Sequence, residues 1–224
     1  MNELSRFRKP NHLRFVLVAL ALTIAAGMVI PWDDEIAQFL YLDELPGDVH
    51  RVVHLAEIFG HGFCIMIVLV GIWLLSPRDR RFLPRIASMA ILPGLVVQVL
   101  KSNLVRPRPI QFLPDLENIG DVWIRWVTDS WNSQYLQQSF PSGHTATAVG
   151  LAIGLGSVYP RGRALFYLLA ALTAFQRVAD NAHWTGDVLA GAAIAVSTSW
   201  LLLSATPKLF GWIENRGDRE RISD

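Results

Sequence analysis

The chain contains 224 residues, with 20 Lys and Arg against 19 Asp and Glu, and 52% of its residues are hydrophobic. A mean hydropathy of +0.33 argues against a soluble domain, because long apolar runs are typical of membrane spans. The near-neutral charge, without a basic and aromatic surface pattern, argues against nucleic-acid binding. The single cysteine, Cys64, excludes an intrachain disulfide.

Hydropathy predicts an all-α fold, a bundle of six transmembrane helices. The predicted spans are His12–Pro31, Val52–Leu75, Pro84–Leu100, Gly143–Tyr159, Ala164–Ala179 and Thr185–Ala205. We expect residues 1–11 to be a basic cytoplasmic leader, residues 12–206 to be the membrane domain and residues 207–224 to be a cytoplasmic tail. A cleaved signal peptide ending near Ala25-Ala26-Gly27 is the alternative for the first span.

The segment between the first two predicted spans is acidic, from Asp33 to Asp48, with apolar residues at intervals. Such a segment predicts a short helix that lies on the outer membrane interface. Indole rings favour the headgroup layer, so we expect five tryptophans at the same interface. They are Trp32, Trp123, Trp126, Trp131 and Trp184.

The second predicted span carries four polar residues at helical spacing. They are His50, His54, Glu57 and His61, which fall on one face of a continuous helix. Three His and a Glu in a membrane could bind a metal ion. They could equally form a polar face packed against other helices or lining a substrate cleft. We adopt the second interpretation, because the segments described next supply a site without a metal.

The first of these segments is Lys101-Ser-Asn-Leu-Val-Arg106-Pro107-Arg108-Pro109. Residues before proline are pushed out of the α region, so the chain should leave the helix near Arg106 and stay extended through Arg108. Lys101 and Arg108 can then approach one anion from different sides, Arg with a planar fork and Lys with a point charge. Interfacial snorkelling of basic side chains is the alternative interpretation.

The second segment is Pro141-Ser142-Gly143-His144, at the start of an apolar run. Ser142 is a plausible N-cap, and the first turn of a helix presents unpaired N–H groups to an oxyanion. Gly143 lets that backbone come close to a bound phosphate. His144 lies beside the anion, where it can donate a proton.

The third segment is Arg177…His183…Asp187. His183 and Asp187 are four residues apart, so on a helix they share one face within hydrogen-bonding reach. A carboxylate on one ring nitrogen fixes the tautomer and leaves the other nitrogen free to attack. A His-x3-Asp pair alone is often structural, but with two other phosphate-type segments the catalytic interpretation is the better one.

In this order, Lys-x6-Arg-Pro, Pro-Ser-Gly-His and Arg-x5-His-x3-Asp resemble the motifs of the type 2 phosphatidic acid phosphatase (PAP2) family, relatives of the vanadium haloperoxidases. The resemblance extends over roughly Val52 to Ala205. The family pattern usually has Ser before the third-motif Arg, where this chain has Gln176. The resemblance implies a six-helix membrane phosphatase that needs no metal or other cofactor.

The resemblance also implies roles for the matching residues. His183 is similar to the nucleophile that takes the phosphoryl group as a phosphohistidine, and Asp187 would orient it. His144 resembles the general acid that protonates the leaving oxygen. The equatorial oxygens of the transition state would be bound by five further residues: Lys101, Arg108, Ser142, Gly143 and Arg177.

The distribution of Lys and Arg predicts the orientation. The termini and the loops on the side without motifs hold fourteen of these residues, and the motif side holds six. Both termini should therefore be cytoplasmic and the site extracytoplasmic, in a membrane that we take to be a bacterial inner membrane.

The expected reaction is hydrolysis of a lipid phosphomonoester or diphosphate. Candidate substrates are undecaprenyl diphosphate, phosphatidylglycerol phosphate, phosphatidic acid and lipid A phosphates; the oligomeric state stays open. Alternatives are a lipid phosphotransferase with the same intermediate, a vanadate-dependent haloperoxidase, and a non-enzymatic lipid transporter or scaffold.

Overall fold

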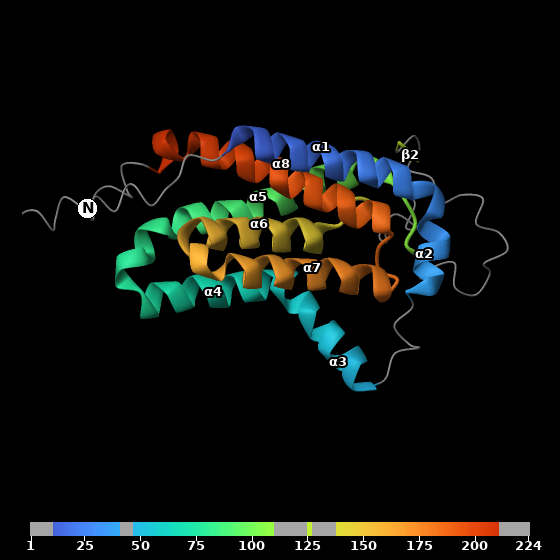
Figure 1. Cartoon of the computed structure of the whole chain (residues 1–224), viewed down its shortest axis with the longest axis horizontal. Coiled ribbons are helices and arrows are strands. Elements are labelled where there is room, and N and C mark those ends of the chain that lie inside the picture. The colour runs from blue at the N-terminus through green and yellow to red at the C-terminus, as the bar shows by residue number, and fades with distance from the viewer. Residues whose placement is uncertain (1–10, 41–46, 110–124, 127–137, 211–224) are drawn as a thin grey trace, which may run out of the picture.

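The computed structural model describes residues 11–40, 47–109, 125–126 and 138–210 (Figure 1). Its longer helices are α1 (His12–Val29), α4 (Gly62–Leu75), α5 (Leu83–Lys101), α6 (Gly143–Val158), α7 (Arg163–Ala179) and α8 (Thr185–Leu209). The shorter ones are η2 (Ile30–Trp32), α2 (Asp33–Phe39), α3 (Gly47–Leu55), η4 (Ala56–Gly60), η5 (Pro77–Phe82) and η9 (Pro160–Gly162). Two-residue strands β1 (Leu104–Val105) and β2 (Arg125–Trp126) pair antiparallel.

Helix α6 packs against α5, α7 and α8, and α1 packs along α8 (Figure 1). Small residues allow this central position. A Cβ at Gly150 of α6 would lie 2.0 Å from the carbonyl oxygen of Met89 on α5, and one at Gly154 would lie 3.3 Å from the Cα of Ile86. Glycines at these positions therefore let the backbones of α5 and α6 approach more closely than larger residues would.

The helices alternate in direction, so segments distant in the sequence meet at the same end of the bundle. The C-terminal ends of α5 and α7 lie with the N-terminal ends of α6 and α8, beside α2 (Figure 1). The arginine-rich connections η5 and η9 lie at the opposite end. All three motif segments are thereby brought to one end of the bundle, opposite these two basic connections.

Among the described residues, three helical segments are long and apolar enough to cross a membrane: His12–Phe39, Pro77–Lys101 and Thr185–Ala205. A fourth is present if Gly47–Gly60 and Gly62–Leu75, which are bent by 68°, count as one span. Helices α6 and α7 have 16 and 17 residues, below the about 20 residues that a transmembrane helix typically needs to cross a bilayer. The chain is an integral membrane helix bundle; the count of six spans stays a prediction.

The second predicted span is not one continuous helix. The chain bends between η4 and α4 at His61, whose backbone is extended (φ −94°, ψ 142°) and whose Nδ1 accepts a hydrogen bond from the Phe63 N–H at 3.2 Å. His61 therefore lies at the bend and not on one continuous helix with His50, His54 and Glu57. The rings of His50 and His54 on α3 meet edge to face, with centroids 4.5 Å apart, while Glu57 lies on η4.

The expected interfacial segment is helical from Asp33 to Phe39, and residues 41–46 lie outside the described residues. Asp33 is fully buried, so the start of α2 is packed against the bundle instead of lying only on the interface. Trp184 is also buried, at 2% exposure, so its ring packs against other protein groups and not among lipid headgroups. Trp32 is exposed as expected, whereas Trp123, Trp131 and the Trp126 side chain are not described.

Candidate active site

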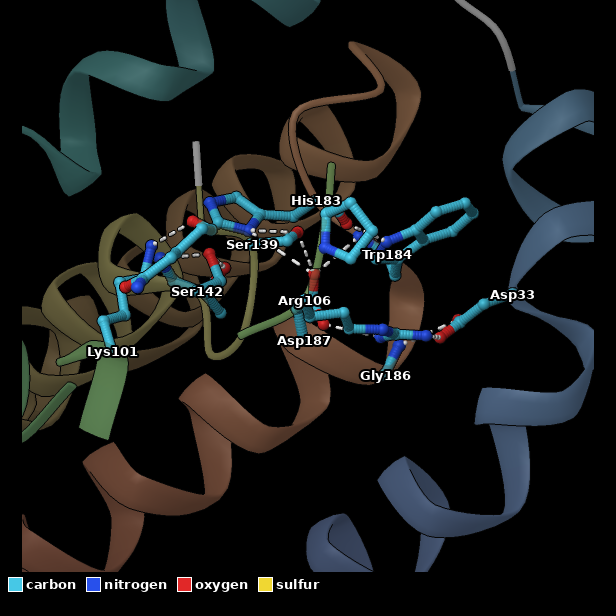
Figure 2. A network of polar contacts seen from close by, with 12 residues as sticks. Asp33, Lys101, Arg106, Ser139, Ser142, His183, Trp184, Gly186 and Asp187 are labelled. Carbon is cyan, nitrogen blue, oxygen red and sulfur yellow. Dashed lines mark hydrogen bonds and ion pairs between the residues drawn. The ribbon is translucent and has the colours of Figure 1, made fainter. Parts of the chain in front are cut away.

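The site is centred on His183, in the turn between α7 and α8. Its backbone N–H donates to the Arg177 carbonyl at 3.0 Å, which closes the turn. Its Nδ1 lies 3.3 Å from Ser139 Oγ and 3.7 Å from Asp187 Oδ2 (Figure 2). Ser139 Oγ also donates to Asp187 Oδ2. Ser139 and Asp187 thus both face one edge of the ring, and the geometry leaves Nε2 free of them.

Asp187 is held by a set of buried donors. The Trp184 N–H donates to Oδ2 at 3.0 Å, as at the first turn of a helix. Arg106 Nη1 donates to Oδ1 at 2.6 Å, and its Nη2 donates to Asp33 Oδ2 at 2.8 Å (Figure 2). The three ionic side chains are fully buried, and Arg106 also lies 5.3 Å from the Trp184 ring. A buried carboxylate with this many partners keeps a fixed orientation.

Ser142 caps α6 as the sequence predicts. Its Oγ accepts from the Thr145 N–H at 3.4 Å, and its own N–H donates to the Asp187 carbonyl at 3.0 Å. A Cβ at Gly191 would lie 2.4 Å from the Ser142 carbonyl oxygen, so glycine lets α8 approach the start of α6. A Cβ at Gly143 would meet nothing closer than Val97 at 3.7 Å. Packing therefore does not explain Gly143, which is consistent with a ligand approaching this first turn.

The cationic side chains also lie at this end of the bundle. Lys101 Nζ donates to the Gln138 carbonyl at 3.1 Å (Figure 2). Arg177 donates from Nη1 to Glu57 Oε1 at 2.7 Å and from Nη2 to Asp180 Oδ2 at 3.2 Å. His144 Nε2 lies 3.5 Å from the same Glu57 oxygen. A phosphate oxygen that binds Arg177 and His144 would compete with Glu57 for both.

Electrostatics favour a neutral His183 ring and an anionic ligand. Burial lowers the pKa of His183 to about 4; the hydrogen bond and charge of Asp187 raise it, and the charges of Lys101 and Arg108 lower it again. The His183 ring is therefore neutral at pH 7, with an unprotonated ring nitrogen. Burial, and next the charge of Arg177, lower the pKa of Arg108. Cations this close repel one another until an anion joins them.

The structure thus brings together the residues that the three motifs predict. Hydrogen bonds link His183, Asp187, Ser142 and Arg177, and His144 lies beside Glu57, which Arg177 binds. Gln176 is fully buried, and its amide has no hydrogen-bond partner among the described residues. This arrangement can bind a tetrahedral oxyanion between cations and present an imidazole nitrogen to it.

Four contributing residues were not predicted as part of the site: Asp33, Glu57, Arg106 and Ser139. Arg106 carried a signal, because it precedes proline in the same Arg-Pro-Arg-Pro run as Arg108. Asp33 contacts Gly186, 153 residues away, and Ser139 contacts Asp187, 48 residues away, so no local spacing marks either residue. The sequence analysis named Glu57 as part of a polar helix face, not as a partner of Arg177.

The alternative metal site gains no support from the described residues. Across residues 11–40, 47–109, 125–126 and 138–210, no group of three His, Cys, Asp or Glu side chains could hold a metal ion. The four polar residues of the predicted second span are divided instead. His54 Nε2 lies 3.6 Å from Asp180 Oδ1, whereas Glu57 binds Arg177 and the His61 ring centroid lies 6.0 Å from that of His144.

Comparisons with known proteins agree on one family. A model of the PAP2 superfamily matches residues 82–210, more than half of the chain. A lipid A 1-phosphatase from Porphyromonas gingivalis is 42% identical over 62 residues, which is 26% of this chain and 14% of that protein. A lipid A 1-phosphatase from Rhizobium johnstonii is 31% identical over 111 residues, which is 50% of this chain and 42% of that protein. The chain thus spans less than half the length of these relatives.

Two crystal structures share the fold. LpxE from Aquifex aeolicus has a TM-score of 0.57 and 21% identity, with 76% of this chain and 93% of that chain covered. The first transmembrane PAP2-type phosphatidylglycerolphosphate phosphatase from Bacillus subtilis has a TM-score of 0.56 and 17% identity, with 88% and 96% covered. Both support the helix arrangement described above.

Proposed function

Because the chain belongs to the PAP2 superfamily, we propose that it is a metal-independent lipid phosphatase that acts through a phosphohistidine at His183. One observation carries the proposal. The buried, neutral imidazole of His183 has Ser139 and Asp187 at its Nδ1 edge, and the charges of Lys101 and Arg108 act on it. This is the electrostatic setting that a nucleophile for a phosphoryl group requires.

The proposed reaction has two displacements at phosphorus. In the first, His183 Nε2 forms a bond to phosphorus while the bond to the lipid oxygen breaks, and His144 gives that oxygen a proton. In the second, water attacks phosphorus, its proton passes to His144, and the N–P bond breaks. Inorganic phosphate leaves, and both histidines return to their starting states.

The cations supply most of the proposed stabilisation. Charge develops on the three equatorial oxygens of a phosphoryl group in transit, so donors fixed before the reaction lower the barrier. We assign this role to Lys101, Arg108 and Arg177, together with the first turn of α6 at Ser142 and Gly143. Arg177 exchanges Glu57 for a phosphate oxygen when substrate binds.

The proposed substrate is a lipid whose headgroup phosphate reaches the site from the membrane. The motif segments lie at the ends of apolar helices, at the level where headgroups lie. The relatives named lipid A 1-phosphatase favour a lipid A phosphate, and the Bacillus subtilis fold neighbour makes phosphatidylglycerol phosphate the next candidate. The basic connections at the opposite end of the bundle support cytoplasmic termini and an extracytoplasmic site.

The test is phosphate release by the purified full chain in detergent. Substrates are lipid A, phosphatidylglycerol phosphate, undecaprenyl diphosphate and phosphatidic acid, each with and without EDTA and vanadate. We expect release from at least one lipid, unchanged by EDTA and inhibited by vanadate, which adopts the five-coordinate geometry of the transition state.

Other outcomes are equally informative. Sensitivity to EDTA would overturn the metal-independent mechanism and return attention to His50, His54, Glu57 and His61. Transfer of the phosphate to a lipid acceptor, without free phosphate, would make the chain a phosphotransferase. Halide oxidation with added vanadate would instead indicate a haloperoxidase.

A further inference from the structure

Asp33 is the innermost carboxylate of the segment that follows α1. It lies outside residues 82–210, which match the family, yet both of its oxygens are engaged with that region. Oδ2 accepts from Arg106 Nη2 at 2.8 Å, and Oδ1 accepts from the Gly186 N–H at 2.9 Å (Figure 2). Its side chain is fully buried, whereas its neighbour Asp34 is only half-buried and Glu35 is exposed.

The buried surroundings of residue 33 are arranged to hold a carboxylate. A charge buried away from water is costly unless partners satisfy it, and here three ionic groups are buried in a row. Arg106 lies between two carboxylates, so the triad of Asp33, Arg106 and Asp187 carries a formal net charge of −1. A Cβ at residue 186 would lie 2.9 Å from Asp33 Oδ2, so glycine there leaves room for the carboxylate.

We propose that Asp33 is a positioning residue. It shares the guanidinium of Arg106 with Asp187 and thereby controls how strongly the Asp187 carboxylate interacts with His183. With Asp33 in place, Arg106 divides its positive charge between two anions. Asp187 therefore keeps more negative charge for Ser139 and for the Nδ1 edge of His183. The segment after the first span is thereby part of the active site without touching substrate. This inference rests on the proposed function of His183.

Removal of the Asp33 charge has a defined electrostatic consequence. The groups that face or act on His183 are Asp187, Ser139, Lys101, Arg108 and His144. In Asp33→Asn, the full charge of Arg106 falls on Asp187, which then stabilises a protonated His183 less well.

Asp33→Asn should change kcat much more than KM. Loss of a group that orients the partner of a reacting side chain costs about 10–100-fold in activity. We expect kcat of Asp33→Asn to fall by that factor, because the nucleophile is weakened. We expect KM to stay within about twofold, since the described hydrogen bonds of Asp33 are with Arg106 and Gly186 and not with the cations assigned to the phosphate.

The test compares Asp33→Asn with Asp34→Asn, a matched loss of charge one residue further along α2. Both are made in the full chain, and activities are normalised to the folded fraction. The control should keep the wild-type kcat and pH profile. Equal behaviour of the two variants, or a fall in activity that disappears after normalisation, would overturn the positioning role.

A second readout needs no turnover. The ring 15N shifts of His183 at pH 7, assigned with His183→Ala, report which nitrogen carries the proton. We expect the wild type to hold Nδ1–H and Asp33→Asn to move toward the Nε2–H tautomer; identical shifts would refute the role of Asp33. If the shift occurs but the wild type hydrolyses no lipid phosphate, the proposed function fails while the positioning role stands.

A third variant covers the case in which Asp33→Asn does not fold. Gly186→Ala keeps every charge but presses a Cβ against Asp33 Oδ2, which displaces the carboxylate. It should change the His183 tautomer in the same direction by a smaller amount. A folded Gly186→Ala with wild-type 15N shifts would count against the proposal.

Discussion

His183→Ala is expected to abolish phosphate release, by about four orders of magnitude or more. The variant removes the nitrogen that bonds to phosphorus, and no other described imidazole contacts both Ser139 and Asp187. The remaining cations would still bind the lipid phosphate, so substrate affinity should persist. Release is measured on the lipid that the wild type prefers, together with thermal unfolding to show that the variant folds.

His12→Ala is the matched control, because it also replaces a histidine by alanine but at a position outside the site. His12 is exposed and only its Nδ1 accepts a hydrogen bond, from Trp200 Nε1 at 2.9 Å. Its activity should equal that of the wild type. Turnover above about one per cent in a folded His183→Ala would contradict the assignment of the nucleophile, since loss of a covalent catalyst costs far more.

Arg106→Met is expected to have the largest effect on stability. It leaves Asp33 and Asp187 buried without their shared counterion, and removal of one partner from a buried ion pair costs about 3–5 kcal/mol. The unfolding temperature in detergent should fall accordingly, and activity should be lost as the protein unfolds. The double variant Arg106→Met/Asp33→Asn should recover part of the stability, because one of the two uncompensated charges is gone.

The matched control is Arg51→Met, which removes an exposed arginine that lies 3.6 Å from Asp48. Exposed ion pairs contribute little, so its unfolding temperature should match that of the wild type. If Arg106→Met unfolded at the same temperature as Arg51→Met, the buried triad would not stabilise the fold, and the further inference on Asp33 would lose its basis.

Site residues could be predicted from the sequence where they lie close together in the chain. Ser142, His183 and Asp187 could be placed because short motifs carry their own geometry: a cap before an apolar run, and two residues four apart. In the structure these residues lie together, and the Ser142 N–H donates to the Asp187 carbonyl. Asp33 could not be placed, because its partners lie 73 and 153 residues away and no local pattern encodes that contact.

Two details depend on tertiary contacts that general residue preferences do not report. The second span appeared continuous because both sides of His61 are apolar enough, and hydropathy does not report a backbone bend of 68°. Trp184 was assigned to the interface because indoles favour headgroups. Its Nε1 instead donates to the Pro107 carbonyl at 2.8 Å inside the bundle, a partner that satisfies a buried indole.

The central claim is that phosphate passes through His183, and trapping that intermediate tests it most directly. The wild type is mixed with a lipid phosphate labelled in its phosphate group, quenched in base during turnover and digested for mass spectrometry. We predict a phosphoryl group on His183 that is stable in base and lost in acid, and that is absent from His183→Ala. Turnover with no phosphoryl group on His183, or with one on another residue, would contradict the account.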